Sequence, residues 1–132
     1  MAFKGERHMN PQNLINKARE VVGEFKLSHD FTAGSVGSAL ITKSGNIYTG
    51  ICIDLACGIG FCAEHAAIAE MLKSRESQIE MIVAVNEEEI LPPCGRCREM
   101  MIQINANNAN TKVIVAEGKI MTLDELLPVR WI

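Results

Sequence analysis

The chain has 132 residues, of which 48% are hydrophobic and 22% charged, and its formal net charge is −3. This length and composition are typical of one globular domain that buries a hydrophobic core. The sequence contains no run of Lys and Arg, so its charge pattern argues against nucleic acid or a membrane surface as a partner. We therefore expect residues 1–132 to fold as a single domain.

The N-terminal composition and the cysteine count indicate the cellular compartment. Residues 1–10 are polar, and no apolar run approaches the roughly 18 residues needed to span a bilayer. Five cysteines is an odd count, and without a secretion signal a disulfide framework is not expected. We expect a cytoplasmic protein with reduced cysteines, in which residues 1–9 form a loose leader.

The first predicted element is a helix. Asn10 followed by Pro11 is a helix-start signal, because asparagine caps a helix and proline is favoured at its first position. The apolar residues that follow recur with a helical period as far as Phe25. The sequence therefore predicts an amphipathic helix that begins at Pro11.

A β-hairpin is expected next. After a loop over residues 28–35, two runs of strand length span Val36–Thr42 and Ile47–Ile53. The short segment between them contains Gly45, which favours a tight turn.

Helices and strands alternate in the second half of the chain. The expected elements are a helix from Cys62 to about Arg75, a strand over Ile79–Val85, a helix over Cys94–Ile104 and a strand over Val113–Val115. The first half of the Cys62 helix is apolar almost all round, so we expect it to be buried between the sheet and another subunit.

The chain is expected to close with a short capped helix. Thr122 and Glu125 have the spacing of a capping box, and this helix would stop before Pro128. The resulting order of helix, hairpin, helix, strand, helix, strand and helix is typical of an α/β protein with helices on both faces of a sheet. The sequence therefore predicts a three-layer α/β/α sandwich with one mixed sheet.

Three cysteines have the spacing of a catalytic metal site. Cys94 and Cys97 lie three residues apart on the first turn of one helix, and Cys62 lies 32 residues before Cys94, at the start of another. The two helix N-termini would lower the pKa of the thiols and offset the charge of three thiolates on one Zn²⁺ ion. Three protein ligands leave the fourth position of zinc open, which is typical of catalytic sites.

An acidic residue accompanies the cysteines. Glu64 follows Cys62 by two residues, so we expect its carboxylate beside the metal rather than on it. There it would take a proton from the attacking water, pass it to a ring nitrogen of the substrate and then protonate the leaving ammonia. We expect Arg96 and His65 to donate hydrogen bonds to the metal-bound sulfurs.

Residues 62–64 (CAE) and 93–97 (PCGRC) together match the signature of the zinc deaminases in its three-cysteine form. With these motifs the sequence resembles the cytidine deaminase superfamily, and the resemblance extends through the predicted hairpin to nearly the whole chain. The resemblance implies that each chain binds one zinc ion and uses Glu64 as its proton shuttle. The implied zinc ligands are Cys62, Cys94 and Cys97.

Within the superfamily the sequence is most similar to the small homotetrameric deaminases, and in places to blasticidin-S deaminase. The similarity rests on Arg96 between the paired cysteines, on residues 125–128 (ELLP) and on Trp131 near the end of the sequence. It implies a homotetramer, with a dimer as the smaller alternative, in which Trp131 closes the pocket of a neighbouring subunit. The alternative for Trp131 is a packing anchor.

The predicted substrate pocket departs from the family pattern. The superfamily binds ribose with an Asn-x-Glu motif, which the resemblance aligns with residues 52–54 (CID). Cys52 cannot make the hydrogen bonds of an amide, whereas Asp54 can still accept one from a hydroxyl. The resemblance also makes Phe31 a candidate aromatic wall over the base.

The substrate class follows from the same resemblance. It implies hydrolysis of a cytosine-type aminopyrimidine nucleoside, cytidine or deoxycytidine, to the uridine product and ammonia. The altered residues 52–54 leave a second substrate class open, another aminated heterocycle such as blasticidin S.

Two interpretations of the cysteines outside this enzyme class remain open. Residues 94–97 (CGRC) alone also fit a thioredoxin-like redox pair, which likewise lies at a helix N-terminus. A structural zinc site would need a fourth protein ligand, from Cys57 or His65. Otherwise we expect Cys52 and Cys57 to be small buried side chains, and His65 to pack or to contact a thiolate.

Overall fold

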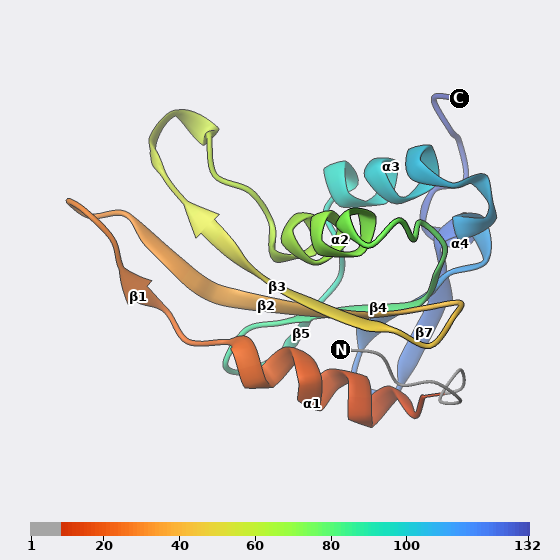
Figure 1. Ribbon diagram of the computed structural model, residues 1–132, viewed down its shortest axis with the longest axis horizontal. Helices are drawn as coiled ribbons and strands as arrows, with labels where there is room; N and C mark the ends of the chain where they lie inside the picture. Colours follow the sequence, from red (N-terminus) through yellow and green to blue (C-terminus); the bar gives the residue numbers. More distant parts are fainter. Residues whose placement is uncertain (1–8) are drawn as a thin grey trace.

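Seven strands pair into one sheet in the computed structural model of the protein, which describes residues 9–132 (Figure 1). The strands are β1 (Phe25–Lys26), β2 (Thr32–Thr42), β3 (Ile47–Asp54), β4 (Ile79–Val85), β5 (Ile90–Leu91), β6 (Lys112–Ala116) and β7 (Lys119–Thr122). The α-helices are α1 (Pro11–Val21), α2 (Ala63–Lys73), α3 (Gly95–Ile104) and α4 (Leu123–Leu126). Two short 3₁₀ helices span Ala56–Gly58 and Ala106–Asn110.

The sheet is mixed, as predicted. Its main path runs β1-β2-β4-β6-β7, while β3 pairs with β2 and β5 pairs with β4. Strands β4 and β6 are parallel, and the other pairs are antiparallel. A parallel pair needs a long crossover connection, which α3 supplies between β4 and β6.

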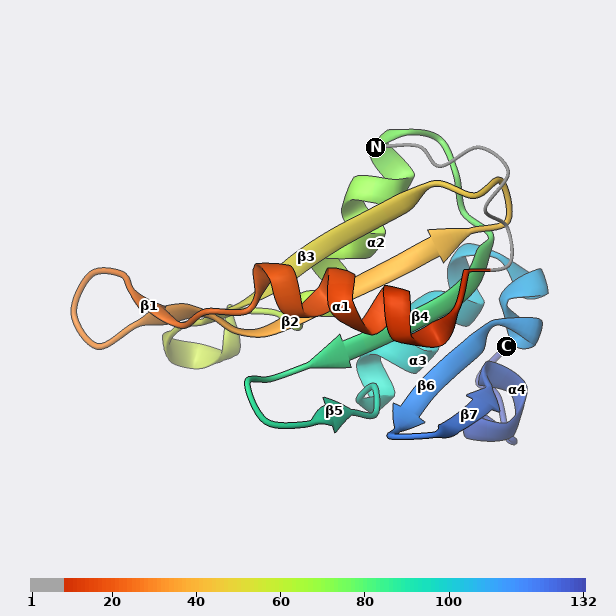
Figure 2. The ribbon, with the colours of Figure 1, turned by 90° about the horizontal axis from the view of Figure 1, so that it is seen from below.

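Helices cover both faces of the sheet. Helix α1 lies on one face, and α2 and α3 lie on the other (Figures 1 and 2). Each face has its own buried core, one built around Leu14, Ile15 and Ala18 of α1 and the other around Ile68 and Met71 of α2. The predicted three-layer α/β/α sandwich is therefore confirmed. None of the helices within residues 9–132 has the length and apolarity needed to cross a membrane.

The first helix begins as predicted but ends earlier. The Asn10 side chain accepts a hydrogen bond from the Gln12 backbone N–H at 2.7 Å, and Pro11 occupies the first turn. The helix stops at Val21, so the prediction that Phe25 continues its apolar stripe is wrong. Phe25 lies on β1 and is 51% exposed, because a Gly23 N–H bond to Gly34 O turns the chain into the sheet.

Several boundaries differ from those predicted from the sequence. Strand β2 begins at Thr32, inside the segment expected to be a loop, and short strands β1, β5 and β7 were not predicted. Met9, expected in the loose leader, is only 6% exposed and packs in the core, while residues 1–8 of that leader lie outside the described part of the chain. The capping box of Thr122 and Glu125 is confirmed at the start of α4.

Helix α2 packs tightly on the sheet, and this contact positions the site. A Cβ atom at Gly50 of β3 would lie 2.5 Å from the Ala66 Cβ and 2.7 Å from the Ala63 carbonyl oxygen. Real side chains do not approach so closely, so only glycine lets α2 lie at this depth. Since Cys62 caps α2 and Glu64 lies in its first turn, this contact fixes where both side chains emerge.

Candidate active site and metal centre

Three sulfur atoms meet where two helices begin. Cys62 and Cys94 are the N-cap residues of α2 and α3, and Cys97 lies in the first turn of α3. The Cys94 Sγ atom lies 3.5 Å from the Sγ atoms of both Cys62 and Cys97, and all three sulfurs lie within 4.8 Å of one another. The structure thus brings the three predicted zinc ligands together, and within residues 9–132 neither Cys57 nor His65 joins the group as a fourth.

This sulfur group matches the size of a zinc site. With Zn–S bonds of about 2.3 Å in a tetrahedron, neighbouring sulfurs would lie roughly 3.8 Å apart. Two of the observed separations are 3.5 Å and the third is at most 4.8 Å, so the cysteines need little rearrangement to bind the ion. Cys62 and Cys94 are the N-caps of α2 and α3, and their sulfurs lie 3.5 Å apart, so the positive N-terminal ends of both helices meet at this site.

The titration of the three thiols also favours a cation among them. Burial raises the pKa of Cys97 far above its usual value, and burial with a hydrogen bond to Cys94 raises the pKa of Cys62 to about 11. Burial also opposes ionisation of Cys94, but hydrogen bonds from Cys97 outweigh it and lower the pKa of the Cys94 thiol. Only one thiol therefore ionises readily by itself, and three thiolates would need a metal ion to offset their charge.

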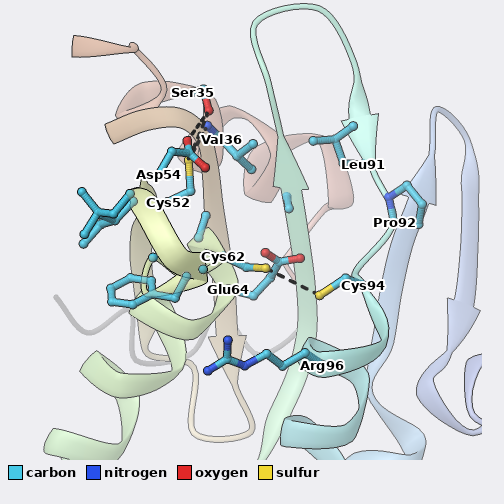
Figure 3. Close-up of a pocket in the computed structure, with 17 residues that line it drawn as sticks. Ser35, Val36, Cys52, Asp54, Cys62, Glu64, Leu91, Pro92, Cys94 and Arg96 are labelled. Carbon is cyan, nitrogen blue, oxygen red and sulfur yellow. Dashed lines mark hydrogen bonds between the residues drawn. The ribbon is translucent and has the colours of Figure 1, made fainter. Parts of the chain in front are cut away.

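Glu64 lies beside the sulfurs, on the first turn of α2 (Figure 3). Its side chain is 5% exposed, and burial raises the pKa of its carboxyl, although a backbone N–H and the Cys97 thiol partly oppose this by hydrogen bonding. A carboxyl with a raised pKa binds and releases a proton nearer neutral pH than an exposed one. The arrangement therefore places a proton-transfer group next to a metal site.

A cavity of about 450 Å³ opens onto Glu64, Cys62 and Cys94. This volume is typical of a pocket for a small organic molecule. Its polar lining comes from Ser35, Asp54, Glu64, Arg96 and the thiols of Cys62 and Cys94, and its apolar lining includes Val36, Phe61, Leu91 and Pro92.

The residues predicted to bind substrate are only partly gathered around this cavity. Cys52 and Asp54 line it, side by side on β3 (Figure 3). Phe31 and Trp131 do not line it within one chain: Phe31 lies in the loop before β2, with its ring 6.0 Å from that of His29, and Trp131 is 81% exposed. Their predicted roles stay predictions.

Phe61 and Ser35 are among the pocket residues that sequence reasoning missed. Phe61 lines the cavity because paired backbone hydrogen bonds of 3.0 Å tie it to Ile53, and its place just before Cys62 was a usable signal. Ser35 lines the cavity because β2 has a register irregularity between Ala33 and Gly37, for which the sequence gives no signal.

The two predicted donors to the sulfurs lie close to the site. His65 is 7% exposed, its Nε2 atom has no hydrogen-bond partner within the described residues, and its ring centroid lies 6.3 Å from that of Phe61. Burial, and then the charge of Arg96, lower the pKa of His65. Arg96 lines the cavity and is exposed, at the end of the site away from Asp54 (Figure 3). Hydrogen bonds from either residue to a sulfur stay predictions.

Comparison with known proteins matches the site and the fold. The family model described as "Cytidine and deoxycytidylate deaminase zinc-binding region" matches residues 10–116. A cytidine deaminase from Halalkalibacterium halodurans is 34% identical over 99 residues, which cover 70% of this chain and 74% of that protein. A cytidine deaminase from Mycobacterium tuberculosis is 27% identical over 71 residues, covering 52% of this chain and 53% of the relative.

Solved structures agree with the fold over a longer range. A crystal structure of cytidine deaminase from Mycobacterium tuberculosis matches with a TM-score of 0.78 at 22% identity, covering 93% of this chain and 98% of that one. One from Burkholderia pseudomallei matches with a TM-score of 0.74 at 26% identity, covering 93% of this chain and 100% of that one. Because the family match includes all three cysteines and Glu64, the chain belongs to the cytidine and deoxycytidylate deaminase family.

Proposed function

We propose that this protein is a zinc-dependent hydrolase that deaminates a cytosine-type aminopyrimidine nucleoside, cytidine or deoxycytidine, and releases ammonia. The observation that carries this proposal is the buried Glu64 carboxyl beside a group of three thiols, at the inner end of a cavity. Hydrolytic deamination needs an activated water and a group that moves protons between water, ring and leaving amine.

Each group of the site has a distinct role. Cys62, Cys94 and Cys97 would hold one zinc ion per chain, which would supply a Lewis acid able to activate water at neutral pH. Glu64 accepts a proton from the attacking water and donates it to a ring nitrogen of the substrate. It then takes the proton of the hydroxyl group added to the ring carbon and gives it to the leaving amine, and its raised pKa assists both transfers because the buried carboxylate readily takes up protons.

Groups around this centre orient the ligands and the substrate. His65 and Arg96 donate hydrogen bonds to the thiolates and limit the negative charge that the site presents. Asp54 accepts a hydrogen bond from the substrate, and the cavity is large enough for a nucleoside. The relatives named cytidine deaminase support cytidine as the first substrate to test. The Cys52 side chain in the pocket wall keeps another aminated heterocycle, such as blasticidin S, as the second candidate.

The proposal also covers the oligomeric state of the protein and its location in the cell. We infer a cytoplasmic homotetramer, with a dimer as the alternative, acting on a small molecule and not on nucleic acid. Its support is the net charge of −3, the lack of a basic run, and large apolar side chains exposed on the single chain, among them Ile59, Leu72 and Trp131.

The test is ammonia release by zinc-loaded protein from cytidine, deoxycytidine, cytosine and blasticidin S. We expect turnover of at least one of them, and a loss of more than a thousandfold in kcat for Glu64→Gln, which keeps the shape of the side chain but cannot shuttle the proton. Zinc content serves as the control and should be unchanged in this variant. Undiminished turnover by Glu64→Gln, or no turnover of all four compounds by zinc-loaded protein, would contradict the proposal.

A further inference from the structure

The side chain of Arg98 on α3 binds two backbone carbonyl groups from different parts of the chain. Its Nε atom donates a hydrogen bond to Pro93 O at 2.8 Å, and its Nη1 atom donates one to Leu126 O at 3.1 Å. Arg98 lies one position after Cys97, is half-buried and does not line the cavity. Its guanidinium is thus used by the protein itself and not by a ligand in the cavity.

The Pro93 carbonyl belongs to the segment that delivers Cys94 to the site. This segment, residues 92–94, connects β5 with α3. Pro92 and Pro93 have no backbone N–H, so only their carbonyl groups can join backbone hydrogen bonds. The bond from Arg98 ties down one of these two carbonyl groups, directly before Cys94.

Cys94 is held from both sides by the same arginine. The Arg98 backbone N–H donates a hydrogen bond to Cys94 O at 3.0 Å, while the Arg98 side chain holds the carbonyl before Cys94. As the N-cap of α3, Cys94 is extended, with φ −70° and ψ 169°, so helical hydrogen bonds fix only its carbonyl end. The direction of its side chain therefore depends also on the bond to Pro93.

Among the three cysteines, Cys94 depends most on this bond. Cys97 is buried within α3, and Cys62 follows Phe61, which paired hydrogen bonds of 3.0 Å fix to Ile53. Cys94 is exposed and lies in the connecting segment, so packing fixes it less. Because its sulfur lies 3.5 Å from each of the other two, a displacement of Cys94 alters two of the three sulfur separations.

The second hydrogen bond of the guanidinium fixes its direction. Carbonyl groups in the last turn of a helix lack partners within that helix, and Arg98 binds the carbonyl of Leu126, the last residue of α4 (Figure 1). A guanidinium donates through a rigid planar fork, so binding Leu126 through Nη1 holds Nε toward Pro93. A lysine ammonium has no fixed fork with which to hold both carbonyls in this geometry.

We propose that Arg98 is a positioning residue for the metal site, and that its bond to the Pro93 carbonyl holds the Cys94 sulfur where it can bind zinc together with Cys62 and Cys97. This rests on the zinc centre of the proposed function but not on the substrate. Without the bond, the Cys94 thiolate is less firmly oriented toward the other two, which weakens zinc binding and changes the geometry of the bound metal.

The test measures the zinc affinity of Arg98→Met and Arg98→Lys by competition with a chelator. Methionine keeps an apolar stem but donates no hydrogen bond, and we expect the affinity to fall about ten- to hundredfold, as for other groups that orient metal ligands. Lysine keeps the positive charge. A loss of at least about threefold in Arg98→Lys therefore reports the lost hydrogen-bond geometry and not a lost charge.

A spectrum separates positioning from a general effect on the fold. With Co²⁺ in place of zinc, thiolate-to-metal charge-transfer bands report how many thiolates bind the ion and in what geometry. At saturating Co²⁺ we expect these bands to weaken in Arg98→Met and to recover partly in Arg98→Lys. Arg130→Met is the matched control and should change neither affinity nor spectrum, because the ion pair of Arg130 with Asp124 also lies on α4 but involves no residue of the connecting segment.

Three outcomes would overturn the proposal. The first is an unchanged zinc affinity and cobalt spectrum in Arg98→Met. The others are a weaker affinity with an unchanged spectrum at saturation, and an equal loss in Arg130→Met, because both indicate a general effect on the fold. If Arg98→Met does not fold, the same two measurements on Arg98→Lys decide.

These measurements use no substrate, so their outcome is separate from that of the proposed reaction. Ammonia release by the unmodified protein together with normal metal binding by Arg98→Met would refute only the positioning role. An altered metal site in Arg98→Met, with no turnover of all four compounds by the unmodified protein, would support the positioning role and refute the proposed reaction.

Discussion

Cys62 distinguishes a three-thiolate zinc site from a redox pair formed by Cys94 and Cys97 alone. Its sulfur comes from a different helix than the sulfurs of Cys94 and Cys97, yet lies 3.5 Å from that of Cys94. A redox pair needs only the two cysteines of α3, whereas a three-thiolate zinc site needs Cys62 as well. Only the three-thiolate zinc site therefore predicts that removing Cys62 abolishes zinc binding.

We expect Cys62→Ala to reduce the zinc content from about one ion per chain to near zero, because two thiolates bind the ion too weakly to retain it through purification. Cys57→Ala is the matched control, since Cys57 is exposed, lies outside the sulfur group and should leave zinc unchanged. Elemental analysis of the purified proteins measures both. Full zinc retention by Cys62→Ala, or a reversible disulfide between Cys94 and Cys97, would favour the redox pair, and zinc loss from Cys57→Ala would favour the structural zinc site.

Residues of the site differ in how far the sequence predicted them. Cys94, Cys97 and Glu64 could be placed because each lies within one helical turn of its helix start, where spacing alone fixes which side chains share a face. Ser35 could not be placed, since it reaches the cavity through a bulge that depends on the pairing of β2 with β3. Local patterns encode the reacting centre, whereas tertiary pairing of β2 with β3 brings Ser35 to the cavity.

At the scale of elements, one carboxylate links the hairpin turn to the end of α2. Glu76 follows α2, and its Oε2 atom accepts hydrogen bonds from Asn46 Nδ2 at 2.6 Å and from the Tyr48 hydroxyl at 2.7 Å. Burial alone would raise the pKa of Glu76, but these hydrogen bonds, with one from Thr42, outweigh it and lower the pKa. The folded state therefore favours the ionised form.

This lowered pKa predicts a pH-dependent stability. A carboxyl whose pKa is lower in the folded state stabilises the fold above its unfolded pKa, about 4.3, and that contribution disappears as the pH falls through the folded pKa. At pH 7 we expect Glu76→Gln to lower the free energy of unfolding by about 1 kcal/mol, because a neutral amide accepts weaker hydrogen bonds than a carboxylate. Urea unfolding at pH 7 and at pH 3 should show this difference shrinking at the lower pH.

Glu87→Gln is the control for this experiment. Glu87 is exposed in the loop between β4 and β5, so its loss should leave stability unchanged at both pH values. A Glu76→Gln difference that grows as the pH falls would reverse the sign argued from the hydrogen bonds and contradict the prediction.

The sequence predicted the longer helices and strands better than the short ones, because only a longer segment carries a recognisable residue pattern. The boundaries of β4 agree with the predicted strand, and α3 begins one residue after Cys94, because an apolar run and a helix start are both local signals. Strands β1 and β5 contain two residues each and exist only through their pairing with β2 and β4. No sequence window of that length carries a period, so they could be found only in the folded chain.

On the scale of the whole molecule, the single chain leaves its C-terminal tail uncovered. Val129, Trp131 and Ile132 are 87%, 81% and 70% exposed, and Ile59 and the cavity residue Phe61 are also exposed. Isolated chains seldom leave so many large apolar side chains in water, and association with further copies would cover them. Analytical ultracentrifugation should accordingly give a mass about four times the 14.5 kDa of one chain.

If Trp131 closes the pocket of a neighbouring subunit, mixing Trp131→Ala chains with Glu64→Gln chains should restore activity. We expect Trp131→Ala alone to lower kcat/KM by at least about tenfold, as for loss of a buried aromatic anchor, and Glu64→Gln alone to be inactive. Tetramers refolded from an equal mixture contain both variants. A pocket is intact where a Trp131→Ala chain supplies Glu64 and a neighbouring Glu64→Gln chain supplies Trp131. Random assembly of a symmetric oligomer then places both intact residues in about a quarter of the pockets and restores about a quarter of full activity.

Val129→Ala is the control: Val129 is as exposed in the tail as Trp131, and its replacement should leave kcat/KM unchanged. Activity of the mixture no greater than the mean of the two variants would refute the shared pocket and leave Trp131 as a packing anchor.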